Sequence, residues 1–116
     1  MKTILLTGAT GFVGKQVLKA LGSQNVDIKV ISRKNKHNFF ASFNNIKEVI
    51  TTENFFTESS QWYEQICENV DVIIHVAWYA EPGKYLESPL NLECLAGTLN
   101  FAKSACKQGI KKFVSL

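Results

Sequence analysis

Three glycines, Gly8, Gly11 and Gly14, stand three residues apart between an apolar run, Thr3–Thr7, and a segment with helical spacing. At a junction from strand to helix each has a use. The first permits a tight turn, the second lets backbone approach a pyrophosphate, and the third lets the helix pack closely on the strand. The unpaired N–H groups that begin such a helix stabilise an anionic group. The spacing therefore predicts a loop that holds phosphate.

The phosphate loop of nucleoside triphosphatases also ends in Gly-Lys, as Gly14 and Lys15 do here. That motif requires a glycine where this chain has Ala9, and Ser or Thr where it has Gln16. Both mismatches exclude it. A purely structural turn remains the alternative to a dinucleotide-binding loop.

Cysteine and histidine give no second reactive cluster. The three cysteines, Cys67, Cys94 and Cys106, lack the spacing of metal ligands, and an odd number is a poor disulfide framework. We therefore expect a reduced, cytoplasmic protein without a metal site. Cys106 falls in an apolar helical stripe and is expected to be a buried structural thiol. His75, flanked by strand residues, is expected to be buried and hydrogen-bonded.

Composition and charge narrow the class of protein. The chain has 116 residues, 46% hydrophobic and 20% charged, which is ordinary for one globular domain. A formal net charge of +3 without a clustered basic face argues against binding to nucleic acid. No apolar run reaches the ~20 residues of a membrane span, so we expect no membrane partner.

Strand-like and helix-like segments alternate along the whole chain. This alternation is typical of a parallel sheet with helices on both faces and right-handed crossovers. We predict an α/β fold of the Rossmann type, a doubly wound parallel sheet of about five strands. The expected strands are Thr3–Thr7, Asp27–Ser32, Ile46–Thr51, Val70–Ala77 and Lys112–Leu116.

Three helices are expected between these strands. The first follows the glycines, the second is capped by Thr57, and the third begins at Ser88-Pro89 and stops at Gly109. The segment Asn35–Asn45 has little period and many Asn, so we expect a loop or an irregular segment. The expected buried stripes are Val13, Val17 and Leu21, then Trp62 and Ile66, then Leu92, Leu95, Ala96, Leu99, Ala102 and Cys106.

The motif TGATGFVG at Thr7–Gly14 resembles the T-G-x-x-G-x-x-G fingerprint of the extended short-chain dehydrogenase/reductases. These form the NAD-dependent epimerase/dehydratase family, which acts largely on nucleotide-sugars. VDVIIHVAW is similar to the family's fourth strand, and GTLNFAKSACKQGIKKFVS to its helix and fifth strand. The resemblance implies that residues 1–116 are an NAD(P)-binding Rossmann domain, the N-terminal portion of the family fold. The catalytic and substrate-binding part would then lie outside this segment.

The resemblance also implies which residues contact the cofactor. Residues of the glycine loop would wrap the pyrophosphate, those after the third strand would contact adenine, and those after the fourth would line the ribose and nicotinamide. The family usually has an Asp where this chain has Asn54. The residues carried over are Thr7, Gly8, Thr10, Gly11, Phe12, Val13, Gly14, Asn54, Phe55, Ala77, Trp78 and Tyr79.

The tip of the second strand bears on the choice between the two nicotinamide cofactors. In the NAD-preferring form of this fold an acidic residue there accepts hydrogen bonds from the adenosine ribose. This chain instead has Ser32 and Arg33. A guanidinium can hold phosphate oxygens through two charge-assisted hydrogen bonds, so the tip suits a 2′-phosphate. We predict that NADP(H) is favoured over NAD(H).

The catalytic pair of the family is a Tyr followed four positions later by Lys. Tyr63, Tyr79 and Tyr85 are followed at that distance by Cys67, Gly83 and Pro89, so no catalytic residue is assigned. Three hypotheses stay open: the N-terminal segment of an enzyme, a non-catalytic dinucleotide-binding module, and an inactive truncated remnant. An intact relative would take a nucleotide-sugar substrate and could pair as a homodimer.

Overall fold

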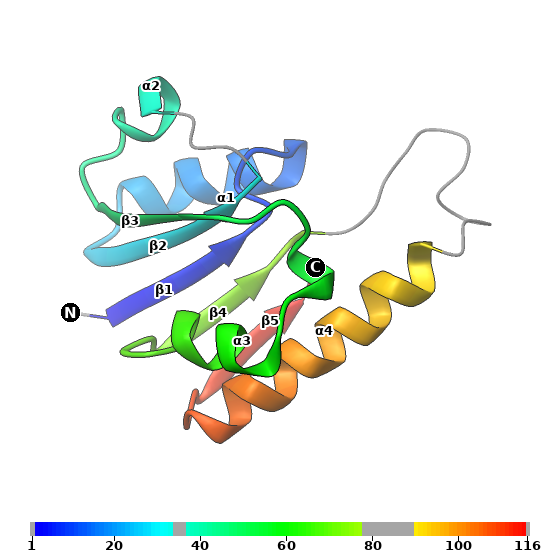
Figure 1. Ribbon diagram of the computed structural model, residues 1–116. Coiled ribbons are helices and arrows are strands. Elements are labelled where there is room, and N and C mark those ends of the chain that lie inside the picture. Colours follow the sequence, from blue (N-terminus) through cyan, green and yellow to red (C-terminus); the bar gives the residue numbers. More distant parts are fainter. Residues whose placement is uncertain (1, 34–36, 78–89, 116) are drawn as a thin grey trace.

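The computed structural model describes residues 2–33, 37–77 and 90–115, which form alternating strands and helices (Figure 1). The short element η1 is a 3-10 turn. In chain order the elements are β1 (Lys2–Thr7), α1 (Phe12–Gly22), β2 (Val26–Ser32), α2 (His37–Phe40), β3 (Ile46–Thr51), η1 (Phe55–Thr57), α3 (Ser60–Ile66), β4 (Val72–His75), α4 (Leu90–Lys107) and β5 (Lys112–Ser115).

The strands of the described residues form one five-stranded sheet in the order β3-β2-β1-β4-β5, and every neighbouring pair is parallel. The chain moves outward from β1 to β2 and β3, then returns to place β4 on the other side of β1. This is the doubly wound order of a Rossmann-type sheet, so the predicted fold class is confirmed. The predicted β3 is reproduced residue for residue, and the other strands agree within a few residues.

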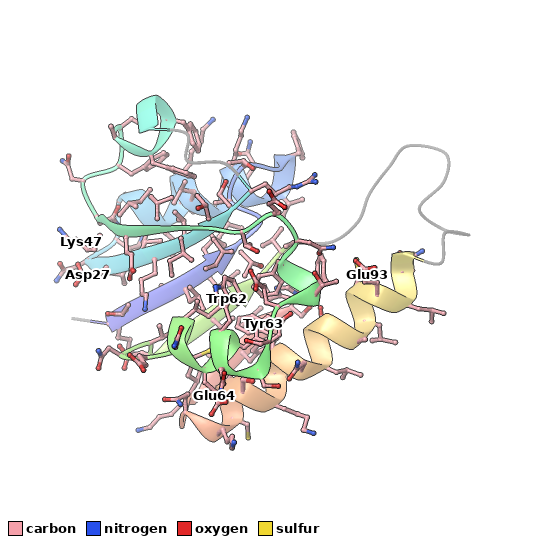
Figure 2. All side chains as sticks on the ribbon, in the orientation of Figure 1. Asp27, Lys47, Trp62, Tyr63, Glu64 and Glu93 are labelled. Carbon is pink, nitrogen blue, oxygen red and sulfur yellow. The ribbon has the colours of Figure 1, made fainter. Side chains whose placement is uncertain are left out.

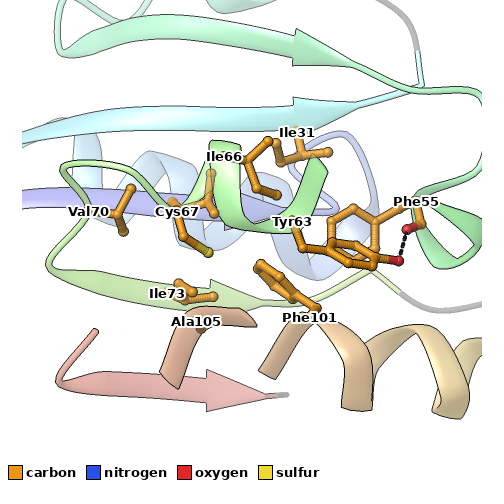
Figure 3. Packing of buried hydrophobic residues seen from close by; sticks show 10 residues of the cluster. Ile31, Phe55, Tyr63, Ile66, Cys67, Val70, Ile73, Phe101 and Ala105 are labelled. Atoms are coloured by element: carbon orange, nitrogen blue, oxygen red, sulfur yellow. Dashed lines mark hydrogen bonds between the residues drawn. The ribbon is translucent and has the colours of Figure 1, made fainter. Parts of the chain in front are cut away.

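The sheet separates two apolar cores because successive side chains of a strand point to opposite faces. Leu5 packs with Tyr63, Ile73 and Phe101 on the face covered by α3 and α4 (Figure 3). Leu6 packs on the other face, which α1 and α2 cover (Figure 1). Both leucines are fully buried, so β1 is the centre of the fold.

The buried line of α1 runs one residue away from the predicted one. Gly14 and Leu18 are buried, and Val17 and Leu21 are partly buried against the same core. Together they make the i, i+3, i+4, i+7 pattern of a helix face. Val13 lies off this line and is 48% exposed, so its predicted burial was wrong.

Helix α3 begins at Ser60, and its cap is Ser59 rather than Thr57. The Ser59 hydroxyl oxygen accepts a hydrogen bond from the Trp62 N–H at 3.1 Å. Thr57 instead ends the separate turn η1, where its hydroxyl donates to the carbonyl of Asn54. Two capping residues stand close together here, and the pattern alone did not separate the turn from the helix.

The segment predicted as a loop between β2 and β3 contains the short helix α2. Phe40 is buried in the core of that face, and the Phe39 ring lies 5.5 Å from the rings of both Phe40 and Phe43. Aromatic packing therefore holds an Asn-rich stretch that has no regular apolar period. The loop prediction was wrong for this part.

Helix α4 turns its predicted apolar stripe toward solvent. Leu92, Leu95 and Leu99 are 71%, 47% and 56% exposed, and Cys106 is exposed as well. The predicted burial of this stripe and of the Cys106 thiol was therefore wrong. The face that packs on the molecule consists of Cys94, Gly97, Phe101, Ser104 and Ala105.

The small residues of that face explain why it, and not the leucine stripe, packs on the rest of the molecule. A Cβ at Gly97 would stand 2.4 Å from the Phe56 carbonyl oxygen, so α4 lies in close contact with η1 at this point. Phe101 packs near Ile73 (Figure 3), in the same core as Leu5. Close backbone approach at Gly97 and the buried Phe101 ring thus fix this face of α4 against the molecule. None of the described helices is both long enough and apolar enough to cross a membrane.

Candidate functional site at the carboxyl ends of β1 and β4

The strand order changes direction between β1 and β4, and open α/β sheets bind ligands outside the carboxyl ends of strands at such a point. Thr7 and His75 are opposite each other in the register of these two strands. Both stand last in their strands. The glycine loop and the start of α1 follow Thr7 directly, so the switch point contains the sequence motif.

Two of the three glycines are required by the packing of the chain itself. Gly8 has φ +70°, and a Cβ there would stand 2.7 Å from the Ala77 amide nitrogen. A Cβ at Gly14 would stand 1.8 Å from the Gly8 carbonyl oxygen. These contacts set the turn against the segment after β4 and set α1 against the turn.

Gly11 differs from both. It is exposed, its φ of −77° is open to any residue, and a Cβ there would meet only the Gly8 carbonyl oxygen at an ordinary 3.6 Å. The described structure therefore gives no packing reason for its missing side chain. A group outside the described residues that approaches the backbone here would supply one.

The start of α1 is open to such a group. Gly11 is the N-cap and offers no side-chain hydrogen bond, and the first turn holds no acidic residue. Phe12 is 83% exposed and Val13 is also exposed, while Thr10 is half-buried. Exposed amides at the positive end of a helix dipole can hold a phosphate group.

The Thr7 hydroxyl joins the ends of β1 and β4. Its oxygen accepts hydrogen bonds from the Val76 N–H at 3.0 Å and the Ala77 N–H at 3.2 Å, and it lies 2.7 Å from Nδ1 of His75. Because these two amides turn toward Thr7, β4 ends at His75 and is shorter than the predicted Val70–Ala77. Ala77 is thereby held beside the glycine turn.

His75 is buried and hydrogen-bonded through both ring nitrogens, as predicted. Its Nε2 lies 2.9 Å from the Thr98 hydroxyl on α4, and the rings of Phe55, Phe101 and Phe113 surround it. Burial lowers the pKa of the imidazole to about 4. It is neutral at pH 7 and has no accessible face toward a ligand.

The loop after β3 is held from two sides by the Asn54 amide. Its Oδ1 accepts from the Phe56 N–H at 3.0 Å, and its Nδ2 donates to Oε1 of Glu93 at 2.8 Å. Figure 2 shows Glu93 near the start of α4. The Phe55 ring is buried, and its carbonyl accepts a hydrogen bond from the Tyr63 hydroxyl at 2.5 Å. A contact of Phe55 with adenine would therefore have to use its main chain.

At the tip of β2, Ser32 is buried and its carbonyl accepts a hydrogen bond from the Thr52 N–H at 3.1 Å. The next residue, Arg33, is exposed. Of the two residues predicted to select the cofactor, only Arg33 thus presents its side chain to solvent. Trp78 and Tyr79, predicted to line the nicotinamide side, lie outside the described residues.

The structure brings the glycine turn, Thr7 and Ala77 into direct contact, and it places Ser32 and Arg33 at the same edge of the sheet. Thr98 and Glu93 were not foreseen. Both sit on the side of α4 that the apolar pattern had assigned to solvent. The Gly97-Thr98 pair was the available signal, because a glycine inside a helix marks a close approach.

The sheet order, the glycine turn and the open start of α1 define a Rossmann-type fold with the geometry of a dinucleotide site. A family profile described as "NAD dependent epimerase/dehydratase family" matches residues 4–116. The chain belongs to this family.

Two curated relatives are similar along nearly the whole chain. UDP-glucuronic acid decarboxylase 1 of Danio rerio is 31% identical over 113 residues, which are 95% of this chain and 26% of the relative. UDP-glucose 4-epimerase of Vibrio cholerae is 32% identical over 117 residues, which cover 97% of this chain and 34% of the relative. The chain therefore spans about a quarter to a third of the length of these relatives.

Solved structures share the fold. The UDP-Glc/GlcNAc 4-epimerase of Campylobacter jejuni matches with a TM-score of 0.79 and 21% identity over 99% of this chain and 36% of that one. Gre2 of Candida albicans in complex with NADPH matches at 0.75 and 25%, over 99% and 36% of the chains. WbmG of Bordetella bronchiseptica in complex with NAD matches at 0.70 and 23%, over 97% and 36%. The same fold thus occurs with either cofactor, so the fold alone does not select one.

Proposed function

We propose that residues 1–116 are the NAD(P)-binding domain of an enzyme that epimerises, dehydrates or reduces a nucleotide-linked sugar. The observation that carries the proposal is Gly11, whose missing side chain serves no contact within the described structure. A pyrophosphate held by the amides at the start of α1 supplies the reason. The nucleotide-sugar part of the proposal is supported by the similarity to a UDP-sugar decarboxylase and a UDP-sugar epimerase.

The residues present fit such a cofactor. The backbone of Gly11, Phe12 and Val13 would hold the pyrophosphate, because their exposed position and the helix dipole favour negative charge. Gly8 and Gly14 keep the turn compact, and Thr7 fixes the loop after β4 beside it. When bound, the nicotinamide supplies a hydride acceptor or donor. The domain's own contribution is to bind and orient it.

Titration of NADPH and NADH, followed by cofactor fluorescence, tests the proposal with Gly11→Ala as the decisive variant. We expect the variant to unfold at the same urea concentration as the wild type and to bind at least about tenfold more weakly, since a methyl group there displaces the phosphate. The matched control is Gln16→Ala, an exposed position of the same helix, which should bind as the wild type does. Equal affinity of Gly11→Ala and wild type contradicts the proposal.

We further propose that NADP(H) is the preferred cofactor, with Arg33 as the residue that holds the 2′-phosphate. Arg33 is exposed at the tip of β2, where the NAD-preferring form has a carboxylate. Arg33→Ala should weaken NADPH about tenfold and leave NADH unchanged, because a charge-assisted hydrogen bond is lost only for the phosphate. Lys47→Ala also removes one positive charge, but near the N-terminal end of β3, at the edge of the sheet opposite to Arg33. It should change the affinity for neither cofactor. If the wild type binds NADH as tightly as NADPH, or more tightly, the proposed preference is wrong.

The two other functional hypotheses make different predictions in the same titration. A non-catalytic module binds the cofactor but is not part of a longer, catalytically active protein. A remnant binds neither NADPH nor NADH. No tyrosine of this chain has a lysine four positions later, so turnover is tested on the protein as the cell makes it. Interconversion of UDP-sugars by that protein supports the enzyme and contradicts both alternatives.

We also propose that two copies pair through the exposed stripe of α4. Leu92, Leu95 and Leu99 lie on one side of the helix and are more exposed than large apolar residues usually are. A single helix face that meets its own copy forms an isologous, twofold contact. Light scattering should give a dimer for the wild type and a monomer for Leu95→Asp with Leu99→Asp. A monomeric wild type at high concentration contradicts the pairing.

A cytoplasmic location completes the proposal. The chain has three cysteines, Cys67, Cys94 and Cys106, and an odd number is a poor disulfide framework, which suits a reducing compartment. Alkylation during lysis should modify all three cysteines of the unfolded chain. A disulfide-bonded fraction taken from intact cells would contradict this location.

A further inference from the structure

The hydrogen bonds around Thr7 fix where the protons of this cluster lie. A threonine hydroxyl has one hydrogen to donate and two lone pairs that accept. The Val76 and Ala77 N–H groups occupy both lone pairs, at 3.0 and 3.2 Å. The hydroxyl hydrogen is therefore left for His75, whose Nδ1 lies at 2.7 Å and must accept it.

This direction determines the tautomer of His75. A neutral imidazole has one nitrogen that accepts and one that donates. Because Nδ1 accepts from Thr7, Nε2 carries the hydrogen and donates it to the Thr98 hydroxyl oxygen at 2.9 Å. The opposite tautomer, or a charged ring, would require the Thr7 oxygen to accept a third hydrogen bond. The low pKa of the buried imidazole, about 4, agrees with a neutral ring.

We propose that Thr98 is a positioning residue: by accepting from His75 it holds the Thr7 hydroxyl in the direction that leaves both lone pairs free to grip the Val76 and Ala77 amides. The chain of contacts runs from α4 through β4 to β1 and back to the segment after β4. That segment lies against Gly8, where a Cβ would already touch the Ala77 nitrogen. A hydroxyl on a distant helix thus sets the backbone beside the glycine turn.

Among the described residues, the hydrogen-bond partners of the His75 ring are Thr7 and Thr98. His75 is 1% exposed and Thr7 is fully buried, so water does not replace a lost partner. Aromatic rings from Phe55, Phe56 and Phe101 pack around the imidazole. Aromatic carbon offers no acceptor comparable to the Thr98 oxygen.

The proposal is tested on the ¹⁵N-labelled chain at pH 7 by long-range proton–nitrogen correlation of the histidine ring. His37→Gln serves as the background, so that His75 gives the single set of imidazole signals. We expect the tautomer protonated at Nε2. A wild-type ring protonated at Nδ1, or at both nitrogens, overturns the proposal.

Substitutions at Thr98 test the positioning role. Thr98→Val keeps the shape and removes the acceptor, so the Nδ1-protonated tautomer should appear. Hydrogen exchange of the Val76 and Ala77 amides should become about tenfold faster, the factor for one net hydrogen bond. Thr98→Ser keeps the oxygen and should restore both signals. An unchanged tautomer and unchanged exchange in Thr98→Val overturn the proposal.

The inference depends on the proposed function only in treating the segment after β4 as part of the cofactor site. Its two readouts, the tautomer and the amide exchange, need no cofactor. Failure of the wild type to bind NADPH would contradict the proposed function and leave these readouts intact. Loss of the readouts with normal NADPH binding would contradict the positioning role alone.

Discussion

Helices α1 and α4 cover opposite faces of the sheet, and each approaches its neighbour through a glycine. A Cβ at Gly14 of α1 would stand 1.8 Å from the Gly8 carbonyl oxygen, and one at Gly97 of α4 would stand 2.4 Å from that of Phe56. The two helices differ in the other residues that they bury. The buried line of α1 continues through Leu18, whereas α4 buries small residues and Phe101 and exposes its leucines.

The difference teaches what an apolar stripe indicates. In α1 the stripe and the close-packing glycine share one face, so the pattern finds the buried side to within one residue. In α4 they lie on different faces, and the glycine determines which side packs. A backbone in direct contact excludes water as well as a leucine does, and it also brings Thr98 and Glu93 to the site.

The largest expected effect breaks the close contact of α1. Gly14→Ala should lower the free energy of unfolding by about 5 kcal/mol, since neither the turn nor the helix can move away from a backbone overlap. Gly97→Ala should cost about 3 kcal/mol, because Phe56 lies on a short turn that can shift. Urea unfolding followed by tryptophan fluorescence measures both. Gly11→Ala is the matched control and should stay within about 0.5 kcal/mol of the wild type.

The next prediction compares one leucine from each helix. Leu18→Ala removes a fully buried side chain and should cost about 4 kcal/mol. Leu99→Ala removes a side chain that is 56% exposed and should change the stability of the dilute protein by less than about 0.5 kcal/mol. Equal losses for the two variants would show that the stripe of α4 is buried after all.

The third prediction concerns the loss of stability in acid. It arises from His75 of β4, which is hydrogen-bonded to Thr98 of α4. His75 has a pKa of about 4 in the folded chain and about 6.5 when unfolded. Between these values the unfolded chain binds a proton that the folded chain does not, so the free energy of unfolding falls as the pH is lowered from 6.5 to 4. The loss should reach about 3 kcal/mol. Above pH 6.5 this group adds no pH dependence.

Variants separate His75 from other titrating groups. His75→Gln should remove most of the slope between pH 6.5 and 4, although the variant is less stable at pH 7. His37→Gln should keep the slope of the wild type. Urea unfolding at a series of pH values gives both, and a persistent slope in His75→Gln would assign it to other groups.

The smallest effect involves no loss of stability and reports the orientation of α4 directly. An aromatic disulfide reagent at pH 8 should react rapidly with Cys106, which is exposed. Cys67 should react only on unfolding, because burial raises its pKa to about 11, and Cys94 because it is 2% exposed. Cys106→Ser should therefore abolish the rapid phase. A rapid phase that persists in this variant would contradict the described packing of α4.

Much of this protein could be predicted from its sequence because the signals are local. Each strand is a short segment rich in β-branched and apolar residues, so β3 was placed correctly and β1, β2 and β5 within one residue. The spacing of Gly8, Gly11 and Gly14 identified the turn between β1 and α1, and with it the fold class. The roles of these glycines in binding remain predictions that Gly11→Ala tests.

Only the tertiary structure decided which face of α4 packs, why Gly14 cannot carry a side chain while Gly11 can, and how His75 is protonated. Each depends on atoms far apart in the chain: Gly97 meets Phe56, Thr7 meets Ala77, and His75 meets Thr98. A sequence pattern records what each residue is, whereas contact between distant backbones depends on how the elements are arranged in space. The sequence identified the apolar stripe of α4, but the packing of the helix on the sheet leaves that stripe exposed to solvent.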